Sequence, residues 1–427
     1  MTVPHIDSYY AASAHAAPAR PPLAGDVEAD VCVVGGGIAG CSTALFLAER
    51  GYKVVLLEGN RIAYGASGRS GGQAIVGYAC SQDKLVAQVG KADARKMFDI
   101  SVEALDLIKY LVAKHRIDCD LQWGHLHAAI KPRQETELRA WQDELVDEYG
   151  YTSTRWLDRA ELAQVLNTQR YIGALRDERS GHLHPLNYTL GLAAAAAAAG
   201  VTIHEESMVV GIDHGATARV RTTGGASVRA KYVALCCNAF IDEKISRHLR
   251  DRIMPVGTYI IATERLGRAR LESLIREKVA VSDVKFVLDY FRCSEDDRLL
   301  FGGRVSYSGR DALNTANATR KRMLNVFPSL ADARVEYAWG GHVDITMSRA
   351  PDFGRLAPNV YYLQGFSGHG IALTGIAGQM VAETIAGQAE RFDLFTQLKH
   401  HDFPGGPALR MPGLVLAMLW FRLKDLL

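Results

Sequence analysis

Asp30-Val-Cys-Val-Val-Gly-Gly-Gly-Ile-Ala-Gly40 joins a short apolar run to a glycine-rich turn and to the start of a helical pattern. The apolar run is rich in β-branched residues and is closed by glycines, which predicts a buried strand. Residues 39–50 continue as a helix, Gly51 suits its left-handed C-cap, and residues 52–57 form a second apolar run that ends at Glu58. Strand, glycine turn, helix, strand and terminal acid in this order predict a dinucleotide-binding unit.

The three glycines of this turn, Gly35, Gly37 and Gly40, have the spacing G-x-G-x-x-G. In a dinucleotide-binding fold the first glycine allows a tight turn, the second lets the backbone approach a pyrophosphate, and the third lets the helix pack closely on the strand. The free N–H groups of the first helical residues, which include Ile38 and Ala39, attract phosphate. A glycine turn without a ligand is the alternative, and the matching strands on both sides argue against it.

Glu58 stands at the end of the second strand, 18 residues after Gly40, where its carboxylate can accept hydrogen bonds from both hydroxyls of an adenosine ribose. Gly59 follows directly, and the nearest cation is Arg61. Because no basic residue stands directly after the acid, a 2′-phosphate, and therefore NADP, is disfavoured at this site. We expect Gly59 and Arg61 to lie beside the same nucleotide.

Composition and charge exclude several classes of protein. The chain has 427 residues, enough for two or three domains, and a net charge of +2 with 22% charged residues gives no basic surface for nucleic acid.

Its seven cysteines form no C-x-x-C pair and several lie in apolar runs, so we expect reduced thiols and a cytoplasmic location. No secretory signal pattern is visible. The apolar run Leu414 to Phe421 is shorter than the roughly 20 residues of a membrane span, so a helix docked on the protein is favoured over membrane contact.

Two further glycine-rich segments can contact a long dinucleotide. The first, Gly65-Ala-Ser-Gly-Arg-Ser-Gly-Gly-Gln73, permits close backbone approach, and we expect it beyond the first sheet edge, at the far end of the ligand. In the second, Tyr361-Tyr-Leu-Gln-Gly-Phe-Ser-Gly-His-Gly370, a strand runs through a glycine turn into a helix. The helix start would offer N–H groups and a positive dipole to the N1–C2=O region of a flavin ring. A plain sheet-to-helix turn is the alternative.

No other segment of the sequence repeats the G-x-G-x-x-G unit. A reductase that moves electrons from NADPH through FAD needs a second nucleotide fold, so we expect no NAD(P) site and a flavoprotein that its organic substrate reduces directly. The expected chemistry is hydride transfer to the flavin from a carbon next to an amine. This step requires a neutral amine held over the ring and little acid–base machinery.

The order of predicted elements indicates an α/β (α+β) protein with a Rossmann-like FAD-binding domain and a substrate domain built on an antiparallel sheet. Apolar spacing predicts helices over residues 83–115, 133–149, 186–199 and 317–327, and a strand of the second sheet over residues 286–292. The expected parts are an arm (1–24), an FAD-binding domain (25–80, 150–240 and 350–390), a substrate domain that covers the reactive face of the flavin (81–149 and 241–349) and a tail (391–427).

The sequence resembles the FAD-dependent amine and amino-acid oxidases of the D-amino-acid oxidase and sarcosine oxidase superfamily in three motifs, Val33-Val-Gly-Gly-Gly-Ile-Ala-Gly40, Gly65 to Gln73, and Gln364-Gly-Phe-Ser-Gly-His-Gly370. More narrowly, it is similar to the γ-glutamylputrescine oxidoreductases in Ser8-Tyr-Tyr-Ala-Ala-Ser13, His184-Pro-Leu-Asn187, Ile345-Thr-Met-Ser-Arg349 and Phe403-Pro-Gly-Gly406. The similarity runs nearly from end to end of the chain.

The resemblance implies a bacterial enzyme of polyamine catabolism that oxidises the primary amine of a γ-glutamylated diamine to an aldehyde and ammonia, with O2 giving hydrogen peroxide. It implies that the Gly35 turn and Glu58 hold the ADP portion of FAD. Further FAD contacts are implied for Gly65, Ala66, Ser67, Gly72, Gln73, Val209, Gly365, Gly368, His369 and Gly370. Some sarcosine oxidases attach their flavin through a cysteine before the last cofactor strand, and residues 341–351 contain none, so we expect FAD without a covalent link.

Several residues are candidates for catalysis or substrate contact. His369 can form a hydrogen bond near the flavin and assist oxygen chemistry with its charge, or only fix the turn. Arg69 can stabilise reduced flavin or superoxide, or bind a phosphate or a carboxylate. Arg304 can pair with the glutamyl carboxylate of the substrate, or be an ordinary surface arginine. The residues that can cover the flavin ring from strands of the second domain are Tyr259, Tyr290, Trp339 and His342, and a structural role is the alternative for each.

Two H-x-H pairs, His125/His127 and His182/His184, are expected to place both rings of each pair on one face of a strand. No cysteine, aspartate or third histidine has suitable spacing, so we expect no metal site.

Three functions stay open from the residues and the resemblance. They are an oxidase of γ-glutamylated amines, a dehydrogenase for a small amino acid that passes electrons to a membrane quinone, and a flavin-containing subunit without turnover of its own. Peroxide formed in step with amine consumption favours the first, and dye or quinone reduction without peroxide favours the second. A bound flavin that no amine bleaches would leave the third.

Overall fold

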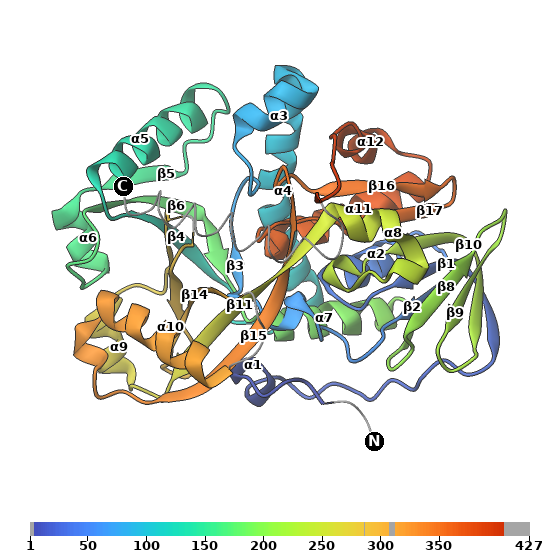
Figure 1. Ribbon diagram of the computed structural model, residues 1–427, viewed down its shortest axis with the longest axis horizontal. Helices are drawn as coiled ribbons and strands as arrows, with labels where there is room; N and C mark the ends of the chain where they lie inside the picture. Colours follow the sequence, from blue (N-terminus) through green and yellow to red (C-terminus); the bar gives the residue numbers. More distant parts are fainter. Residues whose placement is uncertain (1–3, 286, 307–311, 405–427) are drawn as a thin grey trace.

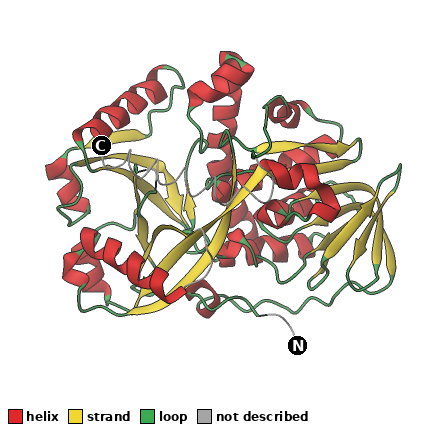
Figure 2. Ribbon diagram, in the orientation of Figure 1, coloured by secondary structure: helices red, strands yellow, loops and turns green. Residues whose placement is uncertain are grey.

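The computed structural model describes residues 4–285, 287–306 and 312–404 of the chain. Its strands form two sheets, and helices pack against each sheet in the two halves seen in Figures 1 and 2. This arrangement confirms the expected fold class, in which a Rossmann-like unit is combined with a mostly antiparallel sheet.

The first sheet carries the dinucleotide-binding unit. Its strands, in order, are β16 (Asp352–Ala357), β17 (Val360–Gln364), β10 (Ser227–Leu235), β1 (Asp26–Val34), β2 (Val54–Leu57) and β7 (Thr202–His204). β17, β10, β1, β2 and β7 run parallel, β16 is antiparallel to β17, and a hairpin of β8 (Val209–Asp213) and β9 (Ala218–Thr222) extends from β10. Because the carboxyl ends of parallel strands meet at one edge, the segments that follow β1, β2, β10 and β17 come together there.

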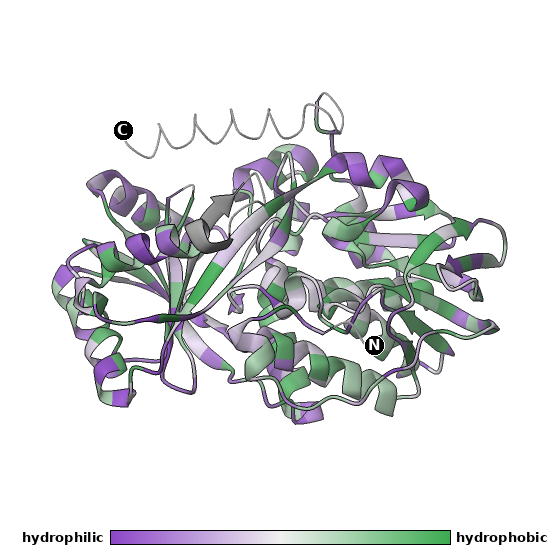
Figure 3. Ribbon diagram, turned by 60° about the horizontal axis from the view of Figure 1, so that its bottom comes forward, coloured by the Kyte–Doolittle hydropathy of each residue, from purple (hydrophilic) through white to green (hydrophobic). Residues whose placement is uncertain are grey.

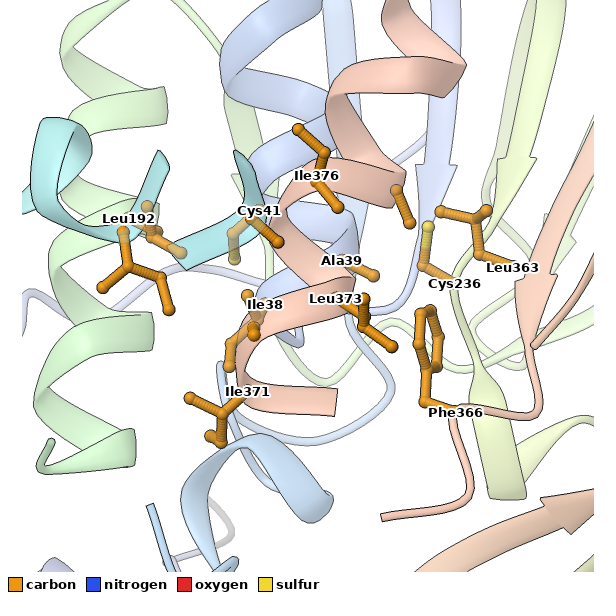
Figure 4. Close-up of a cluster of buried hydrophobic side chains, with 14 of the residues drawn as sticks. Ile38, Ala39, Cys41, Leu192, Cys236, Leu363, Phe366, Ile371, Leu373 and Ile376 are labelled. Carbon is orange, nitrogen blue, oxygen red and sulfur yellow. The ribbon is translucent and has the colours of Figure 1, made fainter. Parts of the chain in front are cut away.

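Helices with small apolar side chains cover one face of this sheet. α2 (Ile38–Ala48) packs between α7 (Pro185–Ala198) and α11 (Gly370–Ile385), and α4 (Lys91–His115) packs on α11. Figure 4 shows the core that these helices share with the neighbouring turns, formed by Ile38, Ala39, Cys41, Leu192, Cys236, Leu363, Phe366, Ile371, Leu373 and Ile376. Packing of α2 on α11 therefore places the N-termini of both helices at the same sheet edge.

The opposite face of the first sheet packs against the β8–β9 hairpin and α8 (Glu243–Arg252). Val55 and Leu57 of β2 share this apolar cluster with Val220 of β9 and Leu249 of α8. Hydrophobic residues run along the interior strands, whereas hydrophilic residues gather on the outer helices (Figure 3). The first sheet is thus buried on both faces, as expected for parallel strands.

The second sheet forms the other half of the molecule. Its strands, in order, are β15 (Val335–Thr346), β11 (Ile253–Thr263), β14 (Leu299–Ser306), β13 (Tyr290–Cys293), β12 (Ala280–Asp283), β4 (Gln122–Ala129), β6 (Gly173–His182) and β3 (Gln73–Ala74), with β5 (Thr154–Leu157) beside β6. All neighbours are antiparallel except β4 and β12. Its outer face packs on α6 (Arg159–Val165), α9 (Arg268–Leu274) and α10 (Ala312–Val326), and α5 (Pro132–Asp147) covers β4 and β6.

A short helix of the N-terminal arm, α1 (Tyr9–Ala12), joins the two halves. Tyr10 is fully buried, and its ring contacts Trp339 of β15 at 5.2 Å and His184 at the start of α7 at 4.9 Å between centroids. Its hydroxyl accepts a hydrogen bond from Arg292 of β13 at 3.1 Å. The arm therefore contacts the second sheet, through Trp339 and Arg292, and helix α7 of the first half, through His184.

The sheets depart from the expected domain boundaries. β3, β5 and β6 belong to the second sheet, whereas residues 25–80 and 150–240 were expected in the FAD-binding domain. β6 lacks apolar alternation because Asp177 is buried in its middle, where it accepts hydrogen bonds from the hydroxyls of Tyr151 and Ser180. We propose that the domain boundaries follow the sheets.

Two predicted elements also differ from the structure. The helix expected over residues 83–115 is divided into α3 (Gln82–Val89) and α4, because Gly90 between them has φ +82°. The strand expected over residues 286–292 begins only at Tyr290, because Asp283 accepts a hydrogen bond from Asp289 N at 3.0 Å and closes a turn. The last described helix, α12 (Glu390–Thr396), packs on β16.

The close packing of α11 on α2 gives a stability prediction. A Cβ at Gly378 would lie 2.7 Å from Thr43 N and 2.8 Å from Ala39 O, both backbone atoms that cannot move independently. Gly378→Ala should therefore lower the free energy of unfolding by about 1–3 kcal/mol, measured by urea denaturation.

Gly375 is the matched control on the same helix, because the nearest atoms to its Cβ position are 3.9 Å away. Gly375→Ala should leave stability unchanged or raise it by up to about 1 kcal/mol through helix propensity. Equal effects of the two substitutions would contradict the packing described above.

Candidate active site

The glycine turn after β1 is built for close contact. Gly35 has φ +110°, and a Cβ there would lie 2.5 Å from the carbonyl oxygen of Cys236. A Cβ at Gly40 would overlap the carbonyl oxygen of Gly35, so only glycine lets α2 pack this closely on β1. Gly37 is the N-cap of α2 and has no capping side chain of its own. Ile38 and Ala39 begin the helix, as the motif predicts.

Glu58 lies directly after β2, facing this turn. Its Oε2 accepts a hydrogen bond from Gly36 N at 2.7 Å, and its Oε1 accepts one from Asn60 N at 2.8 Å. Burial raises the pKa of Glu58, while the N–H groups of Asn60 and Gly36 oppose the rise. A carboxylate has about four acceptor sites, so two remain for the hydroxyls of a ribose.

The charge of Arg61 is paired with a neighbouring carboxylate and is not free to bind a phosphate. Its Nε forms an ion pair with Glu205 Oε2 at 3.0 Å, and Glu205 Oε1 accepts a hydrogen bond from Ile62 N at 2.8 Å. Gly59, beside Glu58, lies against the side chain of Met208. Pairing of Arg61 with Glu205 supports the view that this site does not select a 2′-phosphate.

The segment from Gly65 to Gln73 reaches the start of α2. It includes the short 3-10 helix η1 (Ala66–Gly68), and Ser67 Oγ accepts a hydrogen bond from Ile38 N at 3.0 Å. A Cβ at Gly37 would lie 2.8 Å from this hydroxyl. Ser67 therefore lies beside the helix N-terminus at which the motif predicts the pyrophosphate of a dinucleotide.

The far end of the same segment joins the second sheet. Gly72 has φ +73°, and a Cβ there would overlap the carbonyl oxygen of Leu183. Gln73 lies in β3 and donates a hydrogen bond from Nε2 to Val281 O at 3.1 Å. Val209, at the start of β8, is buried in the apolar cluster beneath the first sheet, and its contact with adenine stays a prediction.

The second glycine turn, Gly365 to Gly370, precedes α11. His369 is the N-cap of this helix and makes no side-chain capping bond. Burial, and then the charges of His127 and Arg349, lower the pKa of His369 to about 4. The imidazole is therefore neutral at pH 7, which disfavours the expected role of its charge in oxygen chemistry and leaves hydrogen bonding.

Polar atoms without partners gather in these loops. Among the described residues, the buried atoms without a hydrogen-bond partner include Ser70 Oγ, Arg69 Nη2, His369 Nδ1 and Asn238 Oδ1. Unpaired buried polar groups are costly, so they indicate a ligand that supplies hydrogen bonds. A dinucleotide with a polar ring system fits this set of donors and acceptors, together with the glycine turns and Glu58.

Three of the predicted residues line one cavity of about 280 Å3, namely Arg69, Tyr259 and Trp339. The guanidinium of Arg69 lies over the ring of Tyr64, 4.4 Å from its centroid, and Trp339 Nε1 donates to the carbonyl oxygen of Arg69 at 2.9 Å. The arm contributes Ile6 and Asp7 to the same cavity. The cavity thus combines a cation, a carboxylate and aromatic side chains.

The other predicted residues lie apart from this cavity. The Tyr290 ring occupies the space that side chains at Gly71 and Gly302 would fill, between the segment Gly65 to Gln73 and strand β14. His342 is exposed on β15, with its ring 6.5 Å from that of Phe240. The backbone of Arg304 pairs with Tyr259 across β14 and β11, and its side chain is outside the described part of the structure.

Sequence reasoning did not assign a role to a group of imidazoles beside the site. The rings of His125 and His127 lie 4.4 Å apart on β4, which confirms their expected shared face. His125 is fully buried with no hydrogen-bond partner on either nitrogen among the described residues. Burial lowers the pKa of His127 to about 4. The H-x-H spacing was the available signal.

Cross-strand pairing in the second sheet aligns His127 with two residues predicted to cover the flavin, Tyr290 and Trp339. His127 pairs with Ser282, Ser282 with Tyr290, and the row continues through Gly302 and Ile260 to Trp339. Residues paired in register share a face of the sheet, so this row faces the first half of the molecule.

The second H-x-H pair does not share a strand face. His182 ends β6, whereas His184 is the N-cap of α7, where its Nδ1 accepts a hydrogen bond from Asn187 N at 3.1 Å. The start of a helix after His182 changes the direction of the chain. This pair was therefore predicted wrongly.

Comparisons with known proteins identify the family of the chain. Residues 30–384 match the FAD dependent oxidoreductase family. The chain is 41% identical over 421 residues to the γ-glutamylputrescine oxidoreductase of Escherichia coli (strain K12), covering 99% of this chain and 98% of the relative. It is 40% identical over 425 residues to the probable oxidoreductase OrdL of Haemophilus influenzae, covering 99% and 97%. The crystal structure of glycine oxidase from Geobacillus kaustophilus matches with a TM-score of 0.74 at 21% identity, over 88% of this chain and 100% of that chain.

Fold and site together define a flavoenzyme whose cofactor is FAD, as the glycine turns and the ribose acid predicted. The chain belongs to the family of FAD-dependent oxidoreductases that contains D-amino-acid oxidase, in the group of the γ-glutamylputrescine oxidoreductases. Within the described ranges, none of the helices combines the length and the apolar composition that a membrane span requires. The run Leu414 to Phe421 lies outside those ranges.

Glu58→Ala should weaken FAD binding, because each charge-assisted hydrogen bond of the carboxylate contributes about 1.5–3 kcal/mol. Loss of one such bond corresponds to a roughly ten- to hundredfold higher dissociation constant, measured by titrating flavin-free protein with FAD. Asp30→Ala is the matched control, because Asp30 accepts a backbone hydrogen bond from Lys53 N at 2.9 Å away from the sheet edge. Unchanged affinity in Glu58→Ala would show that Glu58 does not meet the ribose.

Proposed function

We propose that this protein oxidises the primary amine of a γ-glutamylated diamine, such as γ-glutamylputrescine, with O2 as the electron acceptor. The amine, O2 and water would yield an aldehyde, ammonia and hydrogen peroxide, within polyamine catabolism. The observation that carries the proposal is the end-to-end similarity to the γ-glutamylputrescine oxidoreductase of Escherichia coli. The single dinucleotide unit supports direct reduction of the flavin by the substrate rather than by NAD(P)H.

Bound FAD supplies the chemistry by accepting a hydride from the carbon that carries the amine. In the proposal, Gly35, Gly37 and Glu58 hold the ADP portion, and Ser67 contacts the pyrophosphate. The N–H groups at the start of α11 would face the pyrimidine end of the ring, next to the neutral imidazole of His369. The neutral His125 and His127 add no positive charge that would oppose binding of an amine.

The cavity beside Arg69 supports a zwitterionic substrate. Arg69 Nη2 is buried without a hydrogen-bond partner among the described residues, so it can pair with the carboxylate of a glutamyl group. Asp7 lines the same cavity and can pair with the α-ammonium group, and Tyr259 and Trp339 offer apolar surface to the methylene chain. Free putrescine would bring a second cation towards Arg69, which disfavours its binding.

The substrate assignment is tested by anaerobic bleaching of the flavin absorbance. We expect γ-glutamylputrescine to reduce the flavin at least ten times faster than putrescine, sarcosine or D-amino acids at equal concentration, and aerobic turnover to form peroxide in step with amine consumption. Faster bleaching by sarcosine or a D-amino acid would refute the substrate class. Dye or quinone reduction without peroxide would support a dehydrogenase, and a flavin that no amine bleaches would support a subunit without turnover.

Arg69→Gln should lower the ratio of kcat/KM for γ-glutamylputrescine to kcat/KM for putrescine by roughly ten- to hundredfold. The substitution removes one charge-assisted contact of about 1.5–3 kcal/mol. Arg265→Gln is the matched control, because Arg265 is exposed and pairs with Asp296 at 3.2 Å. An unchanged preference in Arg69→Gln would place the glutamyl group elsewhere.

FAD should be bound without a covalent link. Residues 341–351 contain no cysteine, and burial raises the pKa of the nearby Cys236 thiol to about 12, which keeps it protonated and unreactive. Precipitation with acid should therefore release the yellow colour into the supernatant. Flavin absorbance that stays with the washed pellet would contradict this prediction.

A further inference from the structure

Asp344, near the end of β15, supports the glycine turn that precedes α11. Its carboxylate accepts a hydrogen bond from the backbone N–H of Gly365 and another from the side chain of Asn238. Its backbone carbonyl accepts one from Ser367 N at 3.0 Å. One residue of the second sheet therefore contacts both the turn and the 3-10 helix η2 (Asn238–Phe240) of the first half.

The turn depends on this support because of its backbone conformation. Gly365 has φ +78° and Ser367 has φ +52°, in the left-handed region that favours glycine. Ser367 Oγ donates to Gly365 O at 3.1 Å and accepts from Thr346 N at 3.3 Å. The turn is thus docked on the last residues of β15, and α11 begins two residues after Gly368.

The Asp344 carboxylate is buried without a cation. It is 2% exposed, and no ion pair reaches it among the described residues. Burial raises the pKa of its carboxyl to about 6, against the hydrogen bonds from Gly365 and Asn238. The charged group that acts on it is Asp352 of β16, which raises the pKa further and is itself paired with Arg252 at 3.5 Å and His400 at 3.9 Å.

We propose that Asp344 is a positioning residue that fixes this turn against the pyrimidine end of the flavin and, through its own ionisation, links the flavin to pH. The proposal rests on the placement of FAD in the proposed function. The N–H groups and dipole at the start of α11 favour negative charge on the reduced ring. The ionised carboxylate of Asp344, on the other side of the Gly365 peptide, opposes that charge, and its protonation removes the opposition.

The direction of the pH effect follows from the raised pKa. The carboxyl binds its proton more tightly in the folded protein, with a pKa of about 6, than at the ordinary value of 3.8. Its contribution to stability is therefore fully present below about pH 4 and is lost as the pH rises through about 6. The carboxyl binds its proton still more tightly once the flavin is reduced, so the flavin midpoint potential should fall more steeply as the pH rises above about 6 than it does below that value.

Asp344→Asn tests the proposal with little change of shape. The amide oxygen can accept the hydrogen bond from Gly365 N–H. The Nδ2 group of the new amide can donate to Asn238 Oδ1 if the Asn238 side-chain amide rotates by half a turn. Asn238 Oδ1 has no hydrogen-bond partner among the described residues. The substitution therefore keeps the contacts of the turn and removes the charge.

The midpoint potential of bound FAD is measured by dye equilibration between about pH 5 and pH 8. We expect a bend near pH 6 in the wild type, and in Asp344→Asn no bend and a higher potential at pH 8. Ser367→Ala is the matched control, because it loosens the same turn without removing an ionisable group. It should keep the bend and bind FAD more weakly, by up to about tenfold.

A wild-type curve without a bend, or a bend that persists in Asp344→Asn, overturns the proposal. If Asp344→Asn does not retain FAD, the proposal is tested on the wild type alone, by the bend in its potential and by hydrogen exchange at Gly365 N–H. The protection of this N–H should change between about pH 5 and pH 8. Dye equilibration uses no amine substrate. Failure of the γ-glutamyl assignment would therefore leave this result intact, and the two proposals can fail separately.

Discussion

Contact between Gly40 and the carbonyl oxygen of Gly35 brings α2 against the end of β1 more closely than any side chain would allow. The remaining parts of the site are positioned relative to this helix start. Ser67 accepts the hydrogen bond of Ile38 N, and the carbonyl of Cys236 closes on Gly35 from the neighbouring strand. Segments from three distant parts of the chain therefore meet where the helix dipole is positive.

The loop from Gly65 to Gln73 is held by both halves of the molecule. Trp339 donates to the carbonyl of Arg69, and Arg292 donates to the carbonyl of Gly71 at 3.0 Å. Arg292 is 2% exposed, and its described hydrogen bonds go to carbonyl and hydroxyl oxygens; no carboxylate pairs with it within the described part of the chain. A loop fixed in this way can present its side chains to cofactor and substrate without ordering cost on binding.

Features with a local cause could be predicted from the sequence, and features with distant partners could not. Spacing alone located the turn at Gly35 and the acid at Glu58, because strand, turn and helix are contiguous in the chain. Nothing local shows that Arg61 pairs with Glu205, or that β6 crosses to the second sheet around the buried Asp177. The role of Asp344 likewise could not be predicted from the sequence, since its partner Gly365 follows a strand of the other sheet.

The order of β-strand pairing has a consequence for how the protein is synthesised. β1 leaves the ribosome early, yet its neighbour β10 pairs with it about 200 residues later in the chain, and β17 joins β10 later still. Contacts of such long sequence separation form slowly, and the nascent chain meanwhile carries an unpaired apolar strand edge. The turn before α11 closes the cofactor site only after residue 370 has been translated. Truncated chains therefore cannot assemble the site, and retention of FAD reports that translation has passed this turn.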